Sequence, residues 1–584
     1  MDTHKEFTDR IRPIIIKSHV DLPFEPNITS CHEWINTLPI LNPQSTADMM
    51  STASRALLST PISPIDKFNI SEAVKPCVVK LLSTCISTTE GAKLPLTKKQ
   101  SDLSTQTLEV LTNFHSIYMG IACSTSFMKI DVTRNDEDTP QFSEQQKGLV
   151  IYRAIEFLGI IQFFKSLLYT QTDQGFWNDA NALFALAEGL HIHQFDYLKI
   201  DGEKSTSIEN EFKTIHFFHL AQPNRFRQSD IKTIQCILSI HASNILMSSA
   251  HEQSAGFYVD LSSSTPISHT SNLTATNNQC RFIDNENLVE FMQSDQVIAP
   301  ERHGAISLIS DKPILPKKTI RQLLPSWSTA QSRQAPRHDQ TEEITVYPGF
   351  DSIIRALILK QNPNHFSKKS VPQKKNPLDF GIENLHLIPM DEHQKSHHSV
   401  NDTDMNRALK ASAENSLSSN SIWKKKRSVK PGEKGEAMEA QMNDASLQGL
   451  RFKVSANNNA LLKASDLIGI QTKNESLQLA IIRRINKLED GDISVGVEVM
   501  APSLKIANIK FHDKESTPKP VIFLQGIPAI NQPDTIISPL LLENTHEDIV
   551  LKMKDKVSYY SIDKTIETNQ VFTHYTVLKE TNLD

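Results

Sequence analysis

The interpretation of this sequence starts from one stretch, NDASLQGLRFKV at residues 443–454. It opens as a polar turn with an acid, a hydroxyl and a glycine at fixed offsets, Asp444, Ser446 and Gly449. It continues into residues 450–454, where apolar and basic side chains alternate as in a strand with one buried face. The stretch therefore predicts a turn that leads into a β-strand.

Length and composition bound what surrounds this turn. A chain of 584 residues is too long for one core and predicts several domains. Hydrophobic residues make up 39% and charged residues 22%, which is typical of soluble globular proteins. The net charge of −6 argues against a general binder of nucleic-acid polymers, which would usually be basic. A local basic site for a small anionic ligand is still compatible with this charge.

The cysteines and the apolar segments indicate a cytoplasmic protein. None of the six cysteines forms a C-x-x-C pair, so we expect free thiols in a reducing compartment and no metal site. The N-terminus lacks the pattern of a signal peptide. The most apolar segment, residues 148–169, contains Arg153, Glu156 and Lys165, so we interpret it as a buried helix and expect no membrane span.

The N-terminal half has helical periodicity. We expect residues 1–29 to be extended, because Pro13, Pro23 and Pro26 interrupt any helix there, and residues 30–325 to form a helical domain. The predicted helices are 47–58, 65–87, 98–124, 143–170, 176–190, 208–220, 229–247, 285–295 and 316–325. The only strand predicted in this half is a short one at GFYVDL, residues 256–261.

The C-terminal half changes to β patterns. Residues 326–349 contain a predicted strand at 343–347, residues 350–437 are predicted to be a flexible insert with a weak helix at 351–360, and residues 438–584 are predicted to form a barrel. Its predicted strands are 438–443, 450–455, 466–472, 477–486, 493–500, 506–511, 519–525, 548–553 and 571–578. The predicted fold class is α+β multidomain, with an all-α N-terminal domain followed by an antiparallel β-barrel with a long flexible insertion.

The spacing D-x-S-x-x-G before a strand resembles the second signature of PilZ domains, the bacterial cyclic-di-GMP receptors. The family also carries an R-x-x-x-R arm before the first barrel strand, and Arg333-Gln334-Ala335-Pro336-Arg337 matches it. Residues 477–499 are similar to a later hairpin of the family. Three segments of the N-terminal half, residues 34–42, 176–188 and 221–227, are similar to large bacterial proteins with a helical region ahead of a divergent PilZ-like barrel.

Two arms compete for the role of the first signature. The basic cluster at residues 424–430 is nearer to Asp444 but holds one arginine and no R-x-x-x-R. Arg333 and Arg337 match fully, although their distance from Asp444 is long for the family. We prefer these two arginines, because an insertion at residues 350–437 would restore the family order at little cost in loop-closure entropy.

The resemblance implies a role for each matched residue. Arg333 and Arg337 would bind the ligand phosphates and stack on guanine, because a guanidinium can do both. Asp444 and Ser446 would bind the guanine edge, and Gly449 would permit the turn. Cyclic-di-GMP is then the ligand, with no cofactor, no metal and an unidentified protein partner for the helical half.

Other interpretations stay open at this point. The two arginines could be solvated loop charges, and the acid, serine and glycine could be ordinary turn residues. The protein would then be a PilZ-like scaffold that binds protein partners without nucleotide. We expect no enzyme, because P-loop, G-x-G-x-x-G, G-x-S-x-G and H-E-x-x-H motifs are all missing from the sequence.

Overall fold

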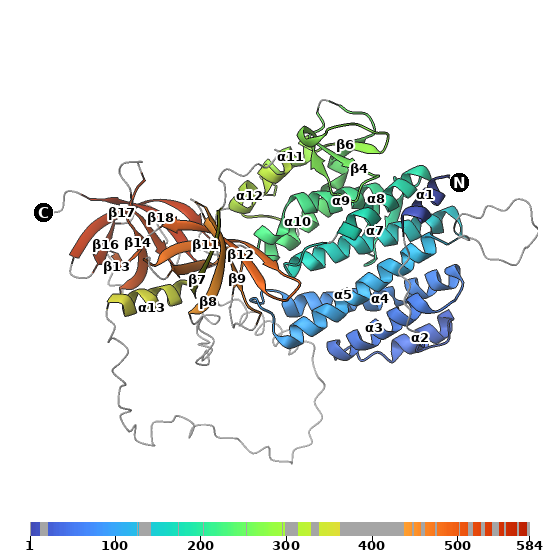
Figure 1. Cartoon of the computed structure of the whole chain (residues 1–584), viewed down its shortest axis with the longest axis horizontal. Helices are drawn as coiled ribbons and strands as arrows, with labels where there is room; N and C mark the ends of the chain where they lie inside the picture. Colours follow the sequence, from blue (N-terminus) through green and yellow to red (C-terminus); the bar gives the residue numbers. More distant parts are fainter. Residues whose placement is uncertain are drawn as a thin grey trace, which may run out of the picture.

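The helical half and two β-barrels form a row in the molecule. The computed structural model describes residues 2–11, 21–124, 127, 142–172, 174–202, 204–252, 254–294, 296–297, 313–328, 338–361, 437–446, 449–456, 462–472, 476–501, 503–511, 518–526, 532–539, 548–553, 556–568 and 571–580. Figure 1 shows the first barrel between the helices and the second barrel. This arrangement confirms the predicted fold class of a helical region followed by an antiparallel β-barrel.

The helices of the described residues are almost all in the N-terminal half. They are α1 (Asp2–Arg10), α2 (Ile28–Asn36), α3 (Pro43–Ser59), α4 (Pro64–Thr89), α5 (Lys98–Ala122), α7 (Glu144–Leu167), α8 (Gln174–Gly189), α9 (Ile208–Leu220), α10 (Gln228–His241), α11 (Glu286–Gln293), α12 (Lys317–Ser328) and α13 (Phe350–Gln361), with short 3-10 turns η1 (Pro223–Arg225), η2 (Ala242–Asn244) and η3 (Thr270–Asn272). Thr97 and Ser143 start α5 and α7 with capping boxes, which satisfy backbone N–H groups of the first turn.

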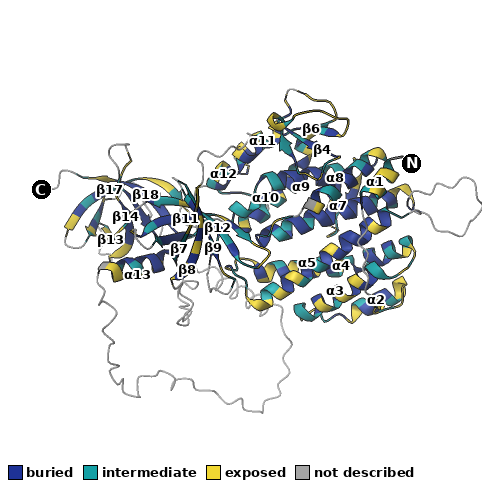
Figure 2. Cartoon of the chain, in the orientation of Figure 1, coloured by how far each residue is buried: buried dark blue, intermediate teal, exposed yellow. Residues whose placement is uncertain are grey.

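Helix α7 is the centre of the helical half. It packs against α5, α8 and α9 and is buried on nearly every side (Figure 2). Its Arg153 is neutralised by Glu72 of α4, with Nε 3.0 Å from Oε1, and by Glu156 one turn along, with Nη1 2.7 Å from Oε2. The interpretation of this apolar segment as a buried helix is therefore confirmed. Across the described residues, no helix is long and apolar enough to cross a bilayer.

The N-terminal segment contradicts the prediction of an extended chain over residues 1–29. Residues 2–10 form α1, which packs against α8 through Phe7, while Ile11 is buried just beyond the helix end. The predicted helix breakers Pro13, Pro23 and Pro26 all lie after this helix and so do not prevent it.

The helical half is not purely α. A hairpin joins β1 (Asp196–Leu198) to β2 (Ser205–Ser207). A four-stranded sheet has the order β3-β6-β4-β5, from β3 (Leu246–Ser248), β4 (Phe257–Asp260), β5 (Ser268–His269) and β6 (Cys280–Asp284). The strand predicted at 256–261 is confirmed as β4, whereas its short partners were missed.

The first barrel is closed and antiparallel. Its strands are β7 (His338–Pro348), β8 (Met438–Ser446), β9 (Gly449–Val454), β10 (Leu467–Thr472), β11 (Gln478–Lys487) and β12 (Ile493–Ala501). They follow the order β10-β11-β12-β9-β8-β7, and β7 closes the barrel by pairing with β10. Strand β7 therefore joins this barrel although residues 349–437 separate it from β8 in the sequence, as the predicted insertion requires.

The region predicted as one barrel, residues 438–584, contains part of the first barrel and the whole of a second. The second barrel has the order β13-β14-β15-β18-β17-β16. Its strands are β13 (Lys505–Phe511), β14 (Lys519–Leu524), β15 (Thr535–Ser538), β16 (Asp548–Met553), β17 (Lys556–Thr568) and β18 (Thr573–Lys579). It has its own core, which includes Phe523, Tyr560 and Tyr575, so it closes separately from the first barrel.

Helix α13 joins the two barrels and corrects the start of the predicted insert. Ile353 and Leu357 share one apolar cluster with Leu479 of the first barrel and with Ile522 and Ile537 of the second. Residues 350–361 thus belong to the folded body. The rest of the predicted insert, residues 362–436, lies outside the described residues.

The helical half is bound directly to the first barrel. Arg227, at the start of α10, donates from Nε to the carbonyl of Ala464 at 3.1 Å, and its Nη2 lies 3.1 Å from Oδ1 of Asp466. Leu94 and Leu462 exchange backbone hydrogen bonds of 3.1 Å. The interior of this barrel belongs to the same apolar cluster as the helices. These contacts define the junction between the helical half and the barrel.

Replacing Ile353 tests whether α13 stabilises the barrel pair. Ile353 is fully buried between the barrels, so Ile353→Ala removes apolar contacts and leaves a cavity. We expect a loss of about 2–4 kcal/mol in the free energy of unfolding, measured by urea denaturation. Leu359→Ala is the matched control, because Leu359 is exposed on the same helix and its replacement should change stability by less than about 0.5 kcal/mol. Equal losses for both variants would contradict this role of α13.

Candidate functional site

The stretch at residues 443–454 forms the hairpin of β8 and β9. Ser446 and Gly449 are opposite each other at its end, and the two residues between them lie outside the described residues. Strand β9 also pairs with β12 on its other side, where Gly449 is opposite Glu498. The predicted strand is present as β9, whereas Asp444 and Ser446, predicted in a turn, lie at the end of β8. Barrel strands hold the hairpin from both directions.

Asp444 is held at the end of β8 by a cross-strand ion pair. The register that starts at Ser446 and Gly449 places Asp444 directly opposite Arg451 of β9, and a register shift follows between Asp444 and Met442. Oδ2 of Asp444 lies 2.6 Å from Nη2 of Arg451. The aspartate side chain is only 4% exposed, whereas the arginine side chain is 48% exposed. A carboxylate with a guanidinium beside it is therefore fixed at this turn.

Ser446 and Gly449 shape the turn itself. The Ser446 hydroxyl donates to the carbonyl of Gly449 at 3.0 Å, which joins the two sides of the hairpin. A Cβ atom on Gly449 would lie 2.1 Å from the carbonyl oxygen of Val497 in β12, far inside van der Waals contact. Glycine is required here because the neighbouring backbone approaches so closely.

Strand β7 begins beside the end of this hairpin. His338 is opposite Ala445, and Asp339 is opposite Asp444. The strand predicted at 343–347 therefore extends back to residue 338, which directly follows Arg337 in the sequence. Arg333 and Arg337 themselves, like the competing cluster at residues 424–430, lie outside the described residues.

Arg451 was not predicted as a site residue, although it lies within the stretch at residues 443–454. The missing signal was the hairpin register. Once Ser446 is opposite Gly449, counting away from the turn along both strands places Arg451 directly opposite Asp444. The long side chain can then reach the carboxylate across the strand pair.

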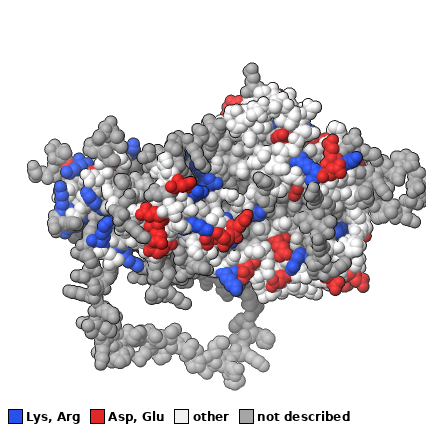
Figure 3. Space-filling view, in the orientation of Figure 1, with Lys and Arg blue, Asp and Glu red and all other residues white. Residues whose placement is uncertain are grey.

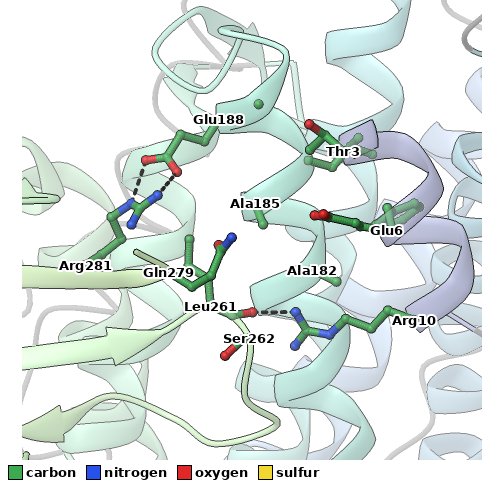
Figure 4. Close-up of a pocket in the computed structure, with 13 residues that line it drawn as sticks. Thr3, Glu6, Arg10, Ala182, Ala185, Glu188, Leu261, Ser262, Gln279 and Arg281 are labelled. Carbon is green, nitrogen blue, oxygen red and sulfur yellow. Dashed lines mark hydrogen bonds and ion pairs between the residues drawn. The ribbon is translucent and has the colours of Figure 1, made fainter. Parts of the chain in front are cut away.

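The helical half contains a separate hollow of about 410 Å³ between α1, α8 and the sheet strand β6 (Figure 4). Both of its arginines are hydrogen-bonded to other parts of the chain. Arg281 donates from Nε to Glu188 at 2.8 Å, and Arg10 donates from Nη2 to the Ser263 carbonyl at 2.7 Å. Burial lowers the pKa of Arg10. Arg10 also donates from Nε to Oδ1 of Asn178 in α8 at 2.8 Å. These contacts fasten α1 and β6 to α8, so we assign this hollow a structural role.

The charged surface of the face shown in Figure 3 has basic and acidic side chains side by side over the helical half. Exposed ion pairs of the helical half include Arg55 with Glu109, 3.1 Å apart. Such a surface agrees with the net charge of −6. A small anionic ligand at one local site fits it better than a long anionic polymer does.

The closed barrel with its D-x-S-x-x-G hairpin has the features expected of a PilZ domain. Comparison with known families identifies the family. Residues 29–251 match the family model described as "Cyclic-di-GMP receptor FimW, N-terminal domain". Residues 257–505 match "Cyclic-di-GMP receptor FimW, middle PilZ domain", which contains the whole first barrel. The chain belongs to this cyclic-di-GMP receptor family, and the PilZ resemblance is confirmed. Neither the curated proteins nor the solved structures contain a match.

A side chain at Gly449 tests the geometry of the turn. In Gly449→Ala the new methyl group meets the Val497 carbonyl, so β9 must move away from β12. We expect a loss of about 1–3 kcal/mol in the free energy of unfolding, measured by denaturation. Gly496→Ala is the control, since its Cβ would lie an ordinary 3.5 Å from Arg484. A Gly449→Ala protein as stable as this control would show that the approach is not tight.

Proposed function

We propose that this chain is a cytoplasmic cyclic-di-GMP receptor that binds its ligand at the β8–β9 turn of the first barrel. Asp444 and Ser446 bind the guanine edge, Gly449 allows the tight turn, and Arg333 and Arg337 bind phosphate and stack on guanine. The family match supports the ligand. The six free cysteines support a reducing compartment.

One observation carries the assignment of the arm. Strand β7 begins at His338, opposite Ala445, so the strand that follows R-x-x-x-R starts beside the acidic turn. The competing cluster at residues 424–430 ends several residues before β8 begins at Met438, the end of β8 farthest from the turn. Strand order thus favours Arg333 and Arg337 as the arm that reaches Asp444.

The route from ligand to helical half runs along β7. One end of this strand pairs with the turn residues Asp444 and Ala445, and its other end pairs with Ile468 of β10. Asp466, two residues before Ile468, forms an ion pair with Arg227 of the helical half. A change in the arm on ligand binding can therefore reach the junction through one strand, provided that the ligand binds two arrangements of it with different affinity.

One observation favours a second candidate, a PilZ-like scaffold that binds proteins without nucleotide. Asp444 is already neutralised by Arg451 and is nearly buried. In that case the turn would be a structural ion pair, and the helical half would bind its partner regardless of cyclic-di-GMP.

Calorimetric titration with cyclic-di-GMP tests the receptor proposal. We expect binding at micromolar concentrations or tighter, abolished in Arg337→Ala and weakened at least tenfold in Asp444→Asn, since each change removes a charge-assisted contact. Lys426→Ala is the control and should bind like the unmodified chain. Absence of binding at tens of micromolar by the unmodified protein would reject the receptor and favour the scaffold.

Arg227→Ala tests the route to the helical half. The variant removes the contacts to Ala464 and Asp466, so we expect ligand affinity to change by less than about threefold while ligand-induced changes in hydrogen exchange of α10 disappear. Arg281→Ala, which breaks an ion pair within the helical half, is the control and should keep these changes. If cyclic-di-GMP still changes the hydrogen exchange of α10 in Arg227→Ala as it does in the unmodified chain, this route is contradicted.

A further inference from the structure

Among the described residues, Arg451 is the basic residue that forms an ion pair with Asp444. It is opposite Asp444 on the neighbouring strand, and its Nη2 contacts Oδ2 of that residue at 2.6 Å. Nearly half of its side chain is open to solvent, whereas the carboxylate is almost covered. A guanidinium carries five donors in a planar fork, more than one carboxylate oxygen can use.

An anionic ligand that binds at this hairpin meets negative charge already there, which the Arg451 guanidinium offsets. Asp339 of β7 is opposite Asp444, so two carboxylates lie on adjacent strands. Cyclic-di-GMP carries two phosphates, and like charges nearby would oppose its approach. Arg451 offsets the charge of the buried member of the pair and leaves the open part of its fork facing solvent.

The distances place Arg451 within reach of a ligand bound to Asp444. A donor atom that binds this carboxylate lies about 2.9 Å from its oxygen. If that oxygen is Oδ2, the donor lies at most about 5.5 Å from Nη2 of Arg451, given the 2.6 Å contact. A change of side-chain rotamer covers this distance without any movement of the strand.

We propose that Arg451 is a third ligand-binding arginine of the site, outside both sequence signatures. It neutralises Asp444 in the free protein and contacts the bound cyclic-di-GMP, by a fork on phosphate or by stacking on guanine. This inference rests on the proposed function, because it concerns the same ligand and the same turn. Under this proposal the Asp444–Arg451 ion pair belongs to the ligand site, so it no longer favours the scaffold.

Substitutions at residue 451 test this role by calorimetric titration with cyclic-di-GMP. Arg451→Ala should bind roughly 10- to 100-fold more weakly, as expected for the loss of a charged hydrogen bond. Arg451→Lys keeps the charge but loses the fork, so its affinity should fall between those of Arg451→Ala and the unmodified chain. Arg55→Ala is the matched control, an exposed arginine with an ion-pair partner at 3.1 Å, and should bind within twofold of the unmodified chain.

A second comparison separates direct contact from positioning of Asp444. In an Asp444→Asn background the ion pair is already weakened, so a further Arg451→Ala change should still reduce affinity at least fivefold if Arg451 touches the ligand. No further loss would mean that Arg451 acts only through Asp444 and would overturn the inference. Equal or tighter binding by Arg451→Ala alone would also overturn it.

The two proposals fail in different ways. If the unmodified chain does not bind cyclic-di-GMP, the proposed function itself fails. If it binds and Arg451→Ala binds equally well, only the third arginine is rejected. Thermal unfolding of each variant checks that it folds, and Arg451→Lys carries the test if Arg451→Ala does not.

Discussion

The contact on which the site depends is the close approach of Gly449 to the carbonyl of Val497. It lets β9 lie tightly against β12 while β8 pairs on the other side, so the hairpin is fixed from two directions. Because the hairpin is fixed, its register sets Asp444 opposite Arg451, and a nearly buried carboxylate lies two residues from the end of β8. The placement of Asp444 beside Arg451 thus depends on a glycine at position 449.

The barrel that carries this turn is not an isolated module. Its interior belongs to the same apolar cluster as the helices, and α13 joins it to the second barrel. Strand β7 runs from the turn to the neighbourhood of the Arg227 junction. The β8–β9 hairpin, the helical half and the second barrel are therefore physically connected, which is the arrangement that the proposed receptor needs in order to pass on a binding event.

Much of the fold was predictable because local pattern and burial agree. Alternation along β8 and β9 is regular, since one face points into the barrel. Strand β15 was missed because all of its residues are buried, which removes the alternation, and β17 was missed because register shifts interrupt it. Helix α1 was missed because prolines beyond its end were given too much weight. That Asp444, Ser446 and Gly449 lie close together on one hairpin was predictable from their spacing, whereas the pairing of Arg451 with Asp444 required the strand register.

A crystal structure of the chain with cyclic-di-GMP tests the central claim most directly. The account predicts the ligand at the β8–β9 turn, with a guanine N–H group within about 3.2 Å of the Asp444 carboxylate and a guanidinium on a phosphate. Ligand bound elsewhere, for example in the hollow between α1 and α8, with the pair of Asp444 and Arg451 unchanged, would contradict it.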